Sequence, residues 1–136
     1  MSYQMIHLEI AYRLLDKCIE AERRGDFLMG AIAPDAVHFH KKYEVRLKER
    51  SHLWNCGPKW GITIDSGKWK ENVLEFWKKH KEDDNRDFIA GYCVHILTEQ
   101  YKDKENYEIS EYQYCSKEVI LTFIDECVEM FLDIFK

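Results

Sequence analysis

A histidine and a carboxylate stand four residues apart in the apolar segment 91–101, GYCVHILTEQY, where His95 and Glu99 fall. At about 100° per residue of helix, the two side chains point in nearly the same direction. Such a pair can bind one metal ion, or it can form a hydrogen bond with no further role. Because the spacing fits both interpretations, the other polar residues that fall among apolar ones decide how the pair is read.

Three more candidate ligands stand elsewhere in the chain. His7 lies on the apolar side of an amphipathic segment, Asp35 follows a proline in GAIAPDAV, and His52 follows a serine in ERSHLW. Each has an ordinary structural interpretation, as a buried imidazole bonded to a carbonyl or as a Pro-Asp turn. Taken together, the five residues supply only nitrogen and oxygen donors, a set that suits zinc and also admits manganese or iron.

The remaining histidines are expected outside this set. His38 and His40 alternate with other residues in AVHFHKK, which we expect to be extended, and we expect both histidines at the periphery. His80 ends a lysine-rich helix and is expected in solvent.

Helices are predicted to position the candidate ligands. Charged residues of segment 3–23 gather on one arc and apolar residues on the other, with Gly25 as the stop. Asp35 is expected to begin a loop or turn, and residues 36–65 are the least regular part. Ser66 can cap a helix through about His80, and Asp83 or Asp84 opens the helix that carries His95.

A capping box at Ser110 and Gln113 predicts a last helix that runs to about Phe135. Sustained alternation of apolar and polar residues, the mark of a strand, is absent from the sequence. The sequence therefore predicts an all-α protein, a single domain over residues 1–136 that forms a compact bundle of four or five main helices. His7 and His95 are expected to face inward or line a cleft.

Composition narrows the functional classes. The 136 residues are 46% hydrophobic and 14% aromatic, which is typical of a folded domain. The net charge of −5, with acids and bases spread along the chain, argues against binding of duplex nucleic acid. With no signal-peptide pattern, no apolar run of membrane-spanning length and five cysteines without zinc-finger spacing, the sequence predicts a cytoplasmic protein without integral membrane contact.

Four short segments resemble the zinc-dependent phospholipase C family, whose all-helical fold is shared with a group of zinc nucleases. They are HLEIA, FLMGAIAPDAVHF, RSHLW and FIAGYCVHILTE. The order His, Pro-Asp, Ser-His and Gly-x-x-x-His-x-x-x-acid agrees between residues 7 and 99. The resemblance therefore covers roughly two thirds of the chain.

By that resemblance, Asp35, His52, His95 and Glu99 would surround one zinc, and His7 would help to hold a second zinc that shares Glu99. In the family the metals bind a phosphodiester and activate a water molecule that attacks phosphorus. The aspartate matching Asp35 has been assigned both as ligand and as general base, and we expect Asp35 to accept the proton. The resemblance thus implies a small phosphodiester substrate.

Several features depart from the family pattern. Glu99 stands where aspartate is usual, the processed amino-terminal tryptophan ligand has no counterpart, and no histidine follows His95 for a third zinc. One or two metal ions are therefore the most that we expect, and the missing membrane-docking domain gives no indication of attack on bilayers. Two alternatives stay open: a non-catalytic helical protein, metal-binding or metal-free, that kept the fold and lost the chemistry, and an unrelated helical domain with structural histidines.

Overall fold

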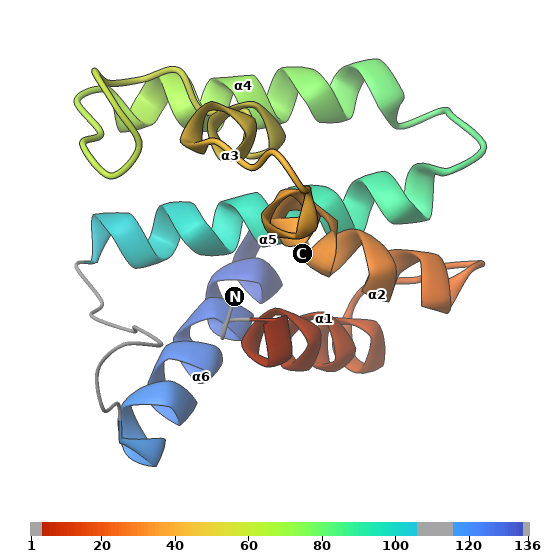
Figure 1. Ribbon diagram of the computed structural model, residues 1–136. Helices are drawn as coiled ribbons and strands as arrows, with labels where there is room; N and C mark the ends of the chain where they lie inside the picture. Colours follow the sequence, from red (N-terminus) through yellow and green to blue (C-terminus); the bar gives the residue numbers. More distant parts are fainter. Residues whose placement is uncertain (1–3, 106–115, 135–136) are drawn as a thin grey trace.

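The computed structural model describes residues 4–105 and 116–134 and is built from helices (Figure 1). The elements are α1 (Gln4–Lys17), α2 (Arg24–Ile32), the 3₁₀-helix η1 (Ala33–Phe39), α3 (Val45–Ser51), α4 (Ser66–His80), α5 (Arg86–Lys104) and α6 (Lys117–Ile134). Within these described ranges there is no strand, only an isolated bridge between Lys59 and Ile62. The prediction of an all-α bundle is confirmed, with a seven-residue α3 in addition to the five longer α-helices.

Helix α5 lies between α4 on one side and α1 and α2 on the other (Figure 1). Its buried residues occupy several faces rather than one stripe: Ile89, Gly91, Cys93, Val94, His95, Ile96 and Thr98. A helix that is covered on opposite sides needs apolar residues around most of its circumference. The position of α5 therefore explains how His95 and Glu99 come to lie in the interior of the fold.

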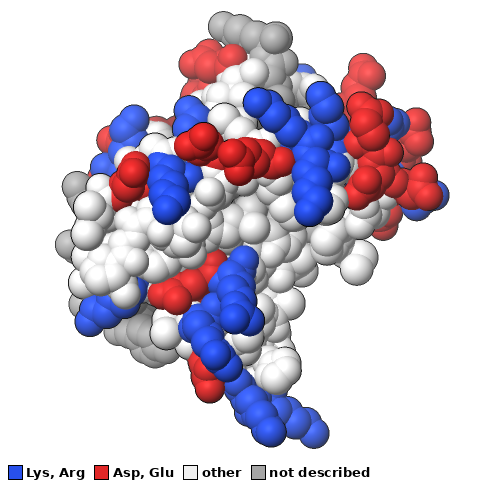
Figure 2. Space-filling model, turned by 90° about the horizontal axis from the view of Figure 1, so that it is seen from above, with Lys and Arg blue, Asp and Glu red and all other residues white. Residues whose placement is uncertain are grey.

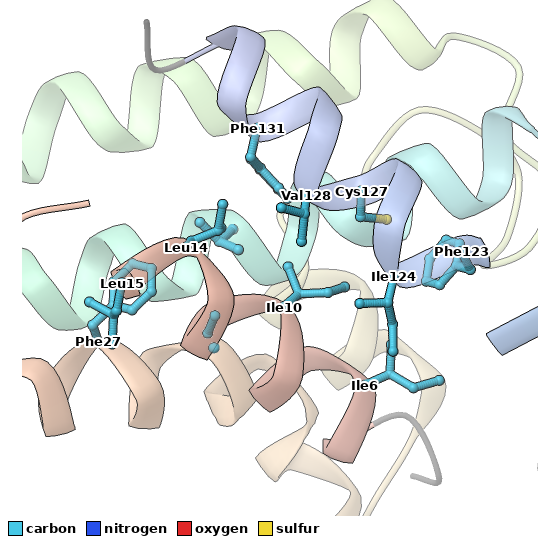
Figure 3. Close-up of a cluster of buried hydrophobic side chains, with 13 residues drawn as sticks. Ile6, Ile10, Leu14, Leu15, Phe27, Phe123, Ile124, Cys127, Val128 and Phe131 are labelled. Carbon is cyan, nitrogen blue, oxygen red and sulfur yellow. The ribbon is translucent and has the colours of Figure 1, made fainter. Parts of the chain in front are cut away.

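Two clusters of buried apolar side chains meet at α5. In the larger one, Ile10 and Leu14 of α1 point toward Val128 and Phe131 of α6 (Figure 3). The smaller one packs tryptophans and Val73 against the other side of α5. Each fully buried side chain of this size stabilises the fold by about 1.5–3 kcal/mol. His95 sits in sequence between Val94 of the first cluster and Ile96 of the second.

Two glycines allow α2 and α5 to touch through their backbones. A Cβ on Gly30 would lie 2.0 Å from the carbonyl oxygen of Phe88, and a Cβ on Gly91 would lie 2.0 Å from that of Phe27. Because these obstacles are backbone atoms, no side-chain rotation can relieve the clash. The close approach fixes the distance between α5, which carries His95, and the chain that leads from α2 into η1.

Several helix boundaries differ from the sequence prediction. Helix α1 ends at Lys17 rather than near Arg23, and Gly25 lies inside α2 instead of stopping α1. The chain does not turn into a loop at Asp35, because Pro34 occupies the first turn of η1, where its missing N–H costs nothing. An added element, α3, falls within the segment 36–65 that was expected to be irregular.

The caps differ as well. Asp65 rather than Ser66 caps α4, since its side chain accepts a hydrogen bond of 3.0 Å from the backbone N–H of Lys68. Helix α5 begins at Arg86, two or three residues after the predicted start at Asp83 or Asp84. The predicted capping box at Ser110 and Gln113 lies outside the described residues, and α6 is described from Lys117 to Ile134.

Two further features concern the length of the described helices and the described cysteines. None of them is both long and apolar enough to cross a membrane. Four cysteines are free thiols, namely Cys18, Cys56, Cys93 and Cys127.

Replacing Gly91 by alanine should strongly destabilise the fold. The new Cβ would meet the backbone of α2, so the two helices must separate, and we expect the free energy of unfolding to fall by about 3 kcal/mol or more. Urea denaturation followed by circular dichroism measures this loss.

The matched control is Gly25→Ala in α2, where nothing lies within 4 Å of the added Cβ. This substitution should stabilise the helix by about 0.5–1 kcal/mol, because glycine loses more conformational freedom on folding. Equal effects of the two substitutions would contradict the close approach of α2 and α5.

Candidate metal centre

Four side chains from three elements converge inside the bundle. His7 comes from α1, Asp35 from η1, and His95 and Glu99 from α5; one ligand atom of each lies within 4.8 Å of the others. This buried group could hold a metal ion. His52, the residue that follows α3, contacts the same group through Asp35 and His95. All five residues that the sequence singled out therefore lie together.

Asp35, His52 and His95 form the most tightly packed part of the group. Asp35 Oδ1 lies 3.2 Å from His52 Nε2 and 3.5 Å from His95 Nε2, and the two Nε2 atoms are 3.3 Å apart. The side chains of these residues are between 0% and 3% exposed. Water does not separate these three atoms, so they face each other directly.

The imidazoles of His52 and His95 donate their Nδ1 hydrogens to main-chain carbonyls. His95 Nδ1 lies 2.6 Å from the carbonyl oxygen of Ala31, and His52 Nδ1 lies 2.9 Å from that of Lys48. A carbonyl oxygen only accepts, so both Nδ1 atoms must carry a hydrogen and donate it. When the imidazoles are neutral, each Nε2 then has no hydrogen and carries a lone pair. Three electron-pair donors thus meet with no proton between them, an arrangement that only an added proton or a metal cation can stabilise.

The spacing of these three atoms fits a tetrahedral metal. Zinc binds imidazole nitrogen and carboxylate oxygen at about 2.0–2.2 Å, and a tetrahedron with such bonds has edges of about 3.3–3.6 Å. The observed separations of 3.2, 3.3 and 3.5 Å are close to these edges. The backbone carbonyls behind His52 and His95 are the kind of partner that orients a metal-binding imidazole.

His7 and Glu99 form the other half of the group. His7 Nε2 lies 3.2 Å from Glu99 Oε1, and the His7 ring stacks on that of His95 at 3.6 Å between centroids. His7 Nδ1 is buried and has no hydrogen-bond partner among the described residues. Glu99 is 12% exposed and Lys102, 3.8 Å away, is 25% exposed, so this half lies nearer to solvent.

Burial and mutual contact set the protonation of these residues. Burial lowers the pKa of His7 to about 4, and the neighbouring His95 adds to the effect while Glu99 opposes it. Burial would raise the pKa of Asp35, but its contacts with the imidazoles of His52 and His95 outweigh that effect and hold the pKa well below its usual range. In Glu99, burial is likewise outweighed by the hydrogen bond and charge of His7, so its pKa is lowered. His7, Asp35 and Glu99 are therefore held in the deprotonated forms that bind metal.

Ser51 ties the chain segments of Asp35 and His52 together. Its hydroxyl oxygen lies 2.9 Å from His52 Nδ1 and 2.8 Å from the carbonyl oxygen of Pro34. The hydroxyl accepts from the imidazole and donates to the carbonyl, so one side chain links the two ligands. The Tyr92 hydroxyl donates to the Ser51 carbonyl and joins both segments to α5.

Helix α4 holds the same segment from the other side. Trp69 Nε1 donates to the His52 carbonyl at 2.8 Å, and Asn72 Nδ2 donates to the Leu53 carbonyl at 2.9 Å. Leu53 has a φ of 55°, a left-handed conformation that turns the chain out of α3 directly after His52. His52 is thus fixed through its main chain as well as through its ring.

The other histidines divide differently from the prediction. His38 lies in η1 rather than in an extended segment; the residue is half-buried, and its Nε2 is shielded without a hydrogen-bond partner in the described part of the chain. His40 is exposed, as expected. His80 is 29% exposed and bonded to Asp83 at 2.7 Å, so it is only partly in solvent. Ser51 was noticed in the sequence only as part of the Ser-His pattern, and the role of Tyr92 could not be predicted because it acts through the main-chain carbonyl of Ser51.

Comparison with known proteins gives no relative for this chain. No family model matches it, and no curated protein or solved structure matches it at a significant level. The resemblance to zinc-dependent phospholipase C therefore stays a prediction.

The metal-free protein should lose stability as the pH falls from 6.5 to 4. In this window His7 takes up a proton in the unfolded chain, whose pKa is near 6.5, but not in the fold, where the pKa is about 4. The expected loss is about 3 kcal/mol. Urea denaturation at a series of pH values, with chelator present, measures it.

A His7→Gln variant should lack this dependence, since glutamine keeps a donor for Glu99 and does not titrate. Any loss from the lowered pKa of Glu99 falls below about pH 4.5, outside most of the window. A wild-type stability that is flat between pH 6.5 and 4 would contradict the burial of a neutral His7.

Removing the Ser51 hydroxyl should weaken metal binding more than it weakens the fold. In Ser51→Ala the link from His52 to Pro34 is lost, and changes in such supporting contacts typically reduce metal affinity by about tenfold to a hundredfold. Competition with a chromophoric zinc chelator gives the affinity, and urea denaturation of the metal-free protein gives the stability.

Thr63→Val is the matched control for Ser51→Ala. The Thr63 hydroxyl accepts a hydrogen bond of 3.2 Å from Trp54 Nε1 but touches none of the candidate ligands. Both variants should lose about 1 kcal/mol of stability, and only Ser51→Ala should lose zinc affinity. Equal zinc affinities would show that Ser51 merely supports the fold.

Proposed function

We propose that this chain is a zinc-dependent hydrolase of small phosphodiesters, with one or two metal ions at the buried cluster. The observation that carries the proposal is the meeting of Asp35 Oδ1, His52 Nε2 and His95 Nε2 at 3.2–3.5 Å, with both Nδ1 protons donated to carbonyls. Buried lone pairs that face each other are unfavourable in an apolar interior unless a cation lies among them. Nitrogen and carboxylate donors favour zinc, and manganese or iron is the next choice.

The five residues would have separate tasks. Asp35, His52 and His95 would hold the first metal, while His7 and Glu99 complete its surroundings or hold a second metal together with it. A zinc ion at such a site lowers the pKa of its water to about 7 and polarises a phosphoryl oxygen. Burial of the three inner ligands excludes bulk water from their contacts, which strengthens every electrostatic interaction there.

Proton transfer is best assigned to a carboxylate near solvent. The sequence favoured Asp35 as the base, but Asp35 is 3% exposed and both imidazoles contact its Oδ1, which suits it as a ligand. Glu99 is 12% exposed and stands on the side of the cluster nearer to solvent. We therefore assign to Glu99 the proton of the attacking water, with Asp35 as the alternative.

A second candidate function is metal binding without catalysis. Its support is the deep burial of His52 and His95, both at 0% exposure, together with the lack of any histidine after His95. Such a protein would bind zinc and leave a phosphodiester intact. Elemental analysis of protein purified without a histidine tag, together with hydrolysis of bis(p-nitrophenyl) phosphate, separates the two functions. The hydrolase predicts both metal and turnover.

An Asp35→Asn variant should lose the metal. The amide keeps the size of the carboxylate but removes the charge that faces both imidazoles, so bound zinc and hydrolysis should both fall by at least tenfold to a hundredfold. Zinc should also raise the melting temperature of the wild type and not of the variant, since ligands spread from residue 7 to residue 99 meet only in the folded chain. A variant with full zinc content would refute the site.

Glu99→Gln tests the outer half separately. If Glu99 accepts the proton of water, the variant should keep most of one zinc and lose hydrolysis, and Glu99→Asp should recover part of the rate. Unchanged turnover in Glu99→Gln would return the role of base to Asp35.

A further inference from the structure

The chain is exposed throughout the segment 39–46, where it passes from η1 into α3. Three of these exposed residues are apolar or aromatic: Phe39 is 66% exposed, Val45 50% and Tyr43 38%. Single apolar residues on a surface are ordinary, but three of them within one short segment form a local patch. Such a patch is typical of a surface that contacts a partner.

Basic residues alternate with the apolar ones in the same segment. Lys41, Lys42 and Arg46 stand there against one acid, Glu44, whose Oε2 lies 2.7 Å from Arg46 Nε. The charges of Glu44 and Arg46 balance each other, so the two lysines leave the segment positive although the chain has a net charge of −5. At physiological salt the Debye length is about 8 Å, so a partner in contact with the segment responds to its local charge.

Acidic side chains concentrate elsewhere on the surface. A surface depression beside the turn from α4 to α5 is lined mainly by acids, among them Glu82, Asp83 and Asp84. Figure 2 shows that Lys and Arg side chains gather on a projecting part of the surface, away from the densest acidic patch of that face. An anionic surface can therefore approach the basic side without meeting the densest acidic patch.

Hydrogen bonds hold the turn between η1 and α3 in a defined conformation. The N–H of His40 donates to the Val37 carbonyl at 3.1 Å, and that of Tyr43 donates to the His40 carbonyl at 3.2 Å. The N–H of Lys42 donates to His40 Nδ1 at 3.1 Å, and the Tyr43 ring packs against His38 at 4.8 Å between centroids. A segment that is already ordered loses less entropy when it docks on a partner.

Apolar side chains beside lysines match the chemistry of an anionic lipid surface. Aromatic and aliphatic side chains enter the boundary between headgroups and acyl chains, while basic side chains stay beside the lipid phosphates. A single-stranded nucleic acid would also attract the lysines and could stack on Phe39. It would leave Val45 without a partner, and the Tyr43 ring is already packed against His38. The lipid surface therefore accounts for more of the segment.

We propose that the segment 39–46 is a docking surface for anionic phospholipid bilayers. Phe39 and Val45 enter the boundary between headgroups and acyl chains, and Lys41 and Lys42 contact the lipid phosphates. None of the candidate metal ligands belongs to the segment, and the docking requires neither a metal nor hydrolysis. Because the segment joins η1 to α3, the two elements that lead to the candidate metal centre, a docked molecule holds that centre close to the membrane.

The test measures how much of the full chain sediments with vesicles of phosphatidylcholine containing about one third of anionic phosphatidylglycerol. The double variant Lys41→Gln/Lys42→Gln should bind about tenfold to thirtyfold more weakly, since each base near an anionic surface contributes about fivefold. Phe39→Gln should bind about tenfold more weakly because it removes the apolar ring. Since all three positions are exposed, melting temperatures should stay those of the wild type.

Matched controls come from α4. Lys78→Gln/Lys79→Gln removes two adjacent exposed lysines at the end of that helix, and Leu74→Gln removes an apolar side chain that is 46% exposed. Each control should change vesicle binding by less than about twofold, because a screened charge away from the contact contributes little. The proposal is overturned if the wild type does not bind the vesicles, binds pure phosphatidylcholine equally well, or binds no better than Lys41→Gln/Lys42→Gln.

Two further measurements test other partners for the same segment. A labelled single-stranded oligonucleotide tests nucleic acid, and sedimentation velocity tests a second copy of the chain. Should either interaction be lost in Lys41→Gln/Lys42→Gln while the wild type ignores vesicles, the segment serves that partner and the proposal fails. Docking is measured without turnover, so a lack of hydrolysis would refute only the proposed function, and a lack of vesicle binding would refute only the docking surface.

Discussion

The close approach of α2 and α5 is the constraint on which the rest of the site depends. With glycine at 30 and 91, the backbones touch, and the Ala31 carbonyl then comes within 2.6 Å of His95 Nδ1. That bond fixes the direction of the imidazole, and the short step from α2 into η1 places Asp35 opposite it. A side chain at Gly30 or Gly91 would push α2 and α5 apart. His95, which lies on α5, would then move away from Asp35, which follows α2.

Packing holds together a polar group that would not gather by itself. Asp35, His52 and His95 are buried with their electron pairs facing each other, and main-chain carbonyls, Ser51 and Tyr92 fix their positions. Without a metal, an extra proton on one imidazole would stabilise the contact with Asp35. A metal cation at the same place would substitute for that proton, so metal binding and protonation would compete for the same few lone pairs.

The sequence predicted the helical class and the candidate ligands because both depend on local pattern and residue type. Helical periodicity placed His7 and His95 on buried faces, and both are buried. The 3₁₀-helix could not be predicted, because the rule that a proline disfavours helix before it also allows a helix to start there. The prediction of an extended segment at His38 was wrong for this reason, since His38 lies in η1, one turn after Asp35.

The two halves of the cluster differ in how firmly they are held, and this difference bears on how many metals bind. The rings of His52 and His95 are each fixed by a carbonyl, and Asp35 is bracketed by both. His7 has one nitrogen without a partner among the described residues, and Glu99 is the ligand nearest to solvent. A preorganised site loses less entropy on binding than a looser one. If the protein binds metal as proposed, the first ion would therefore bind at Asp35, His52 and His95, and a second would bind more weakly beside His7 and Glu99.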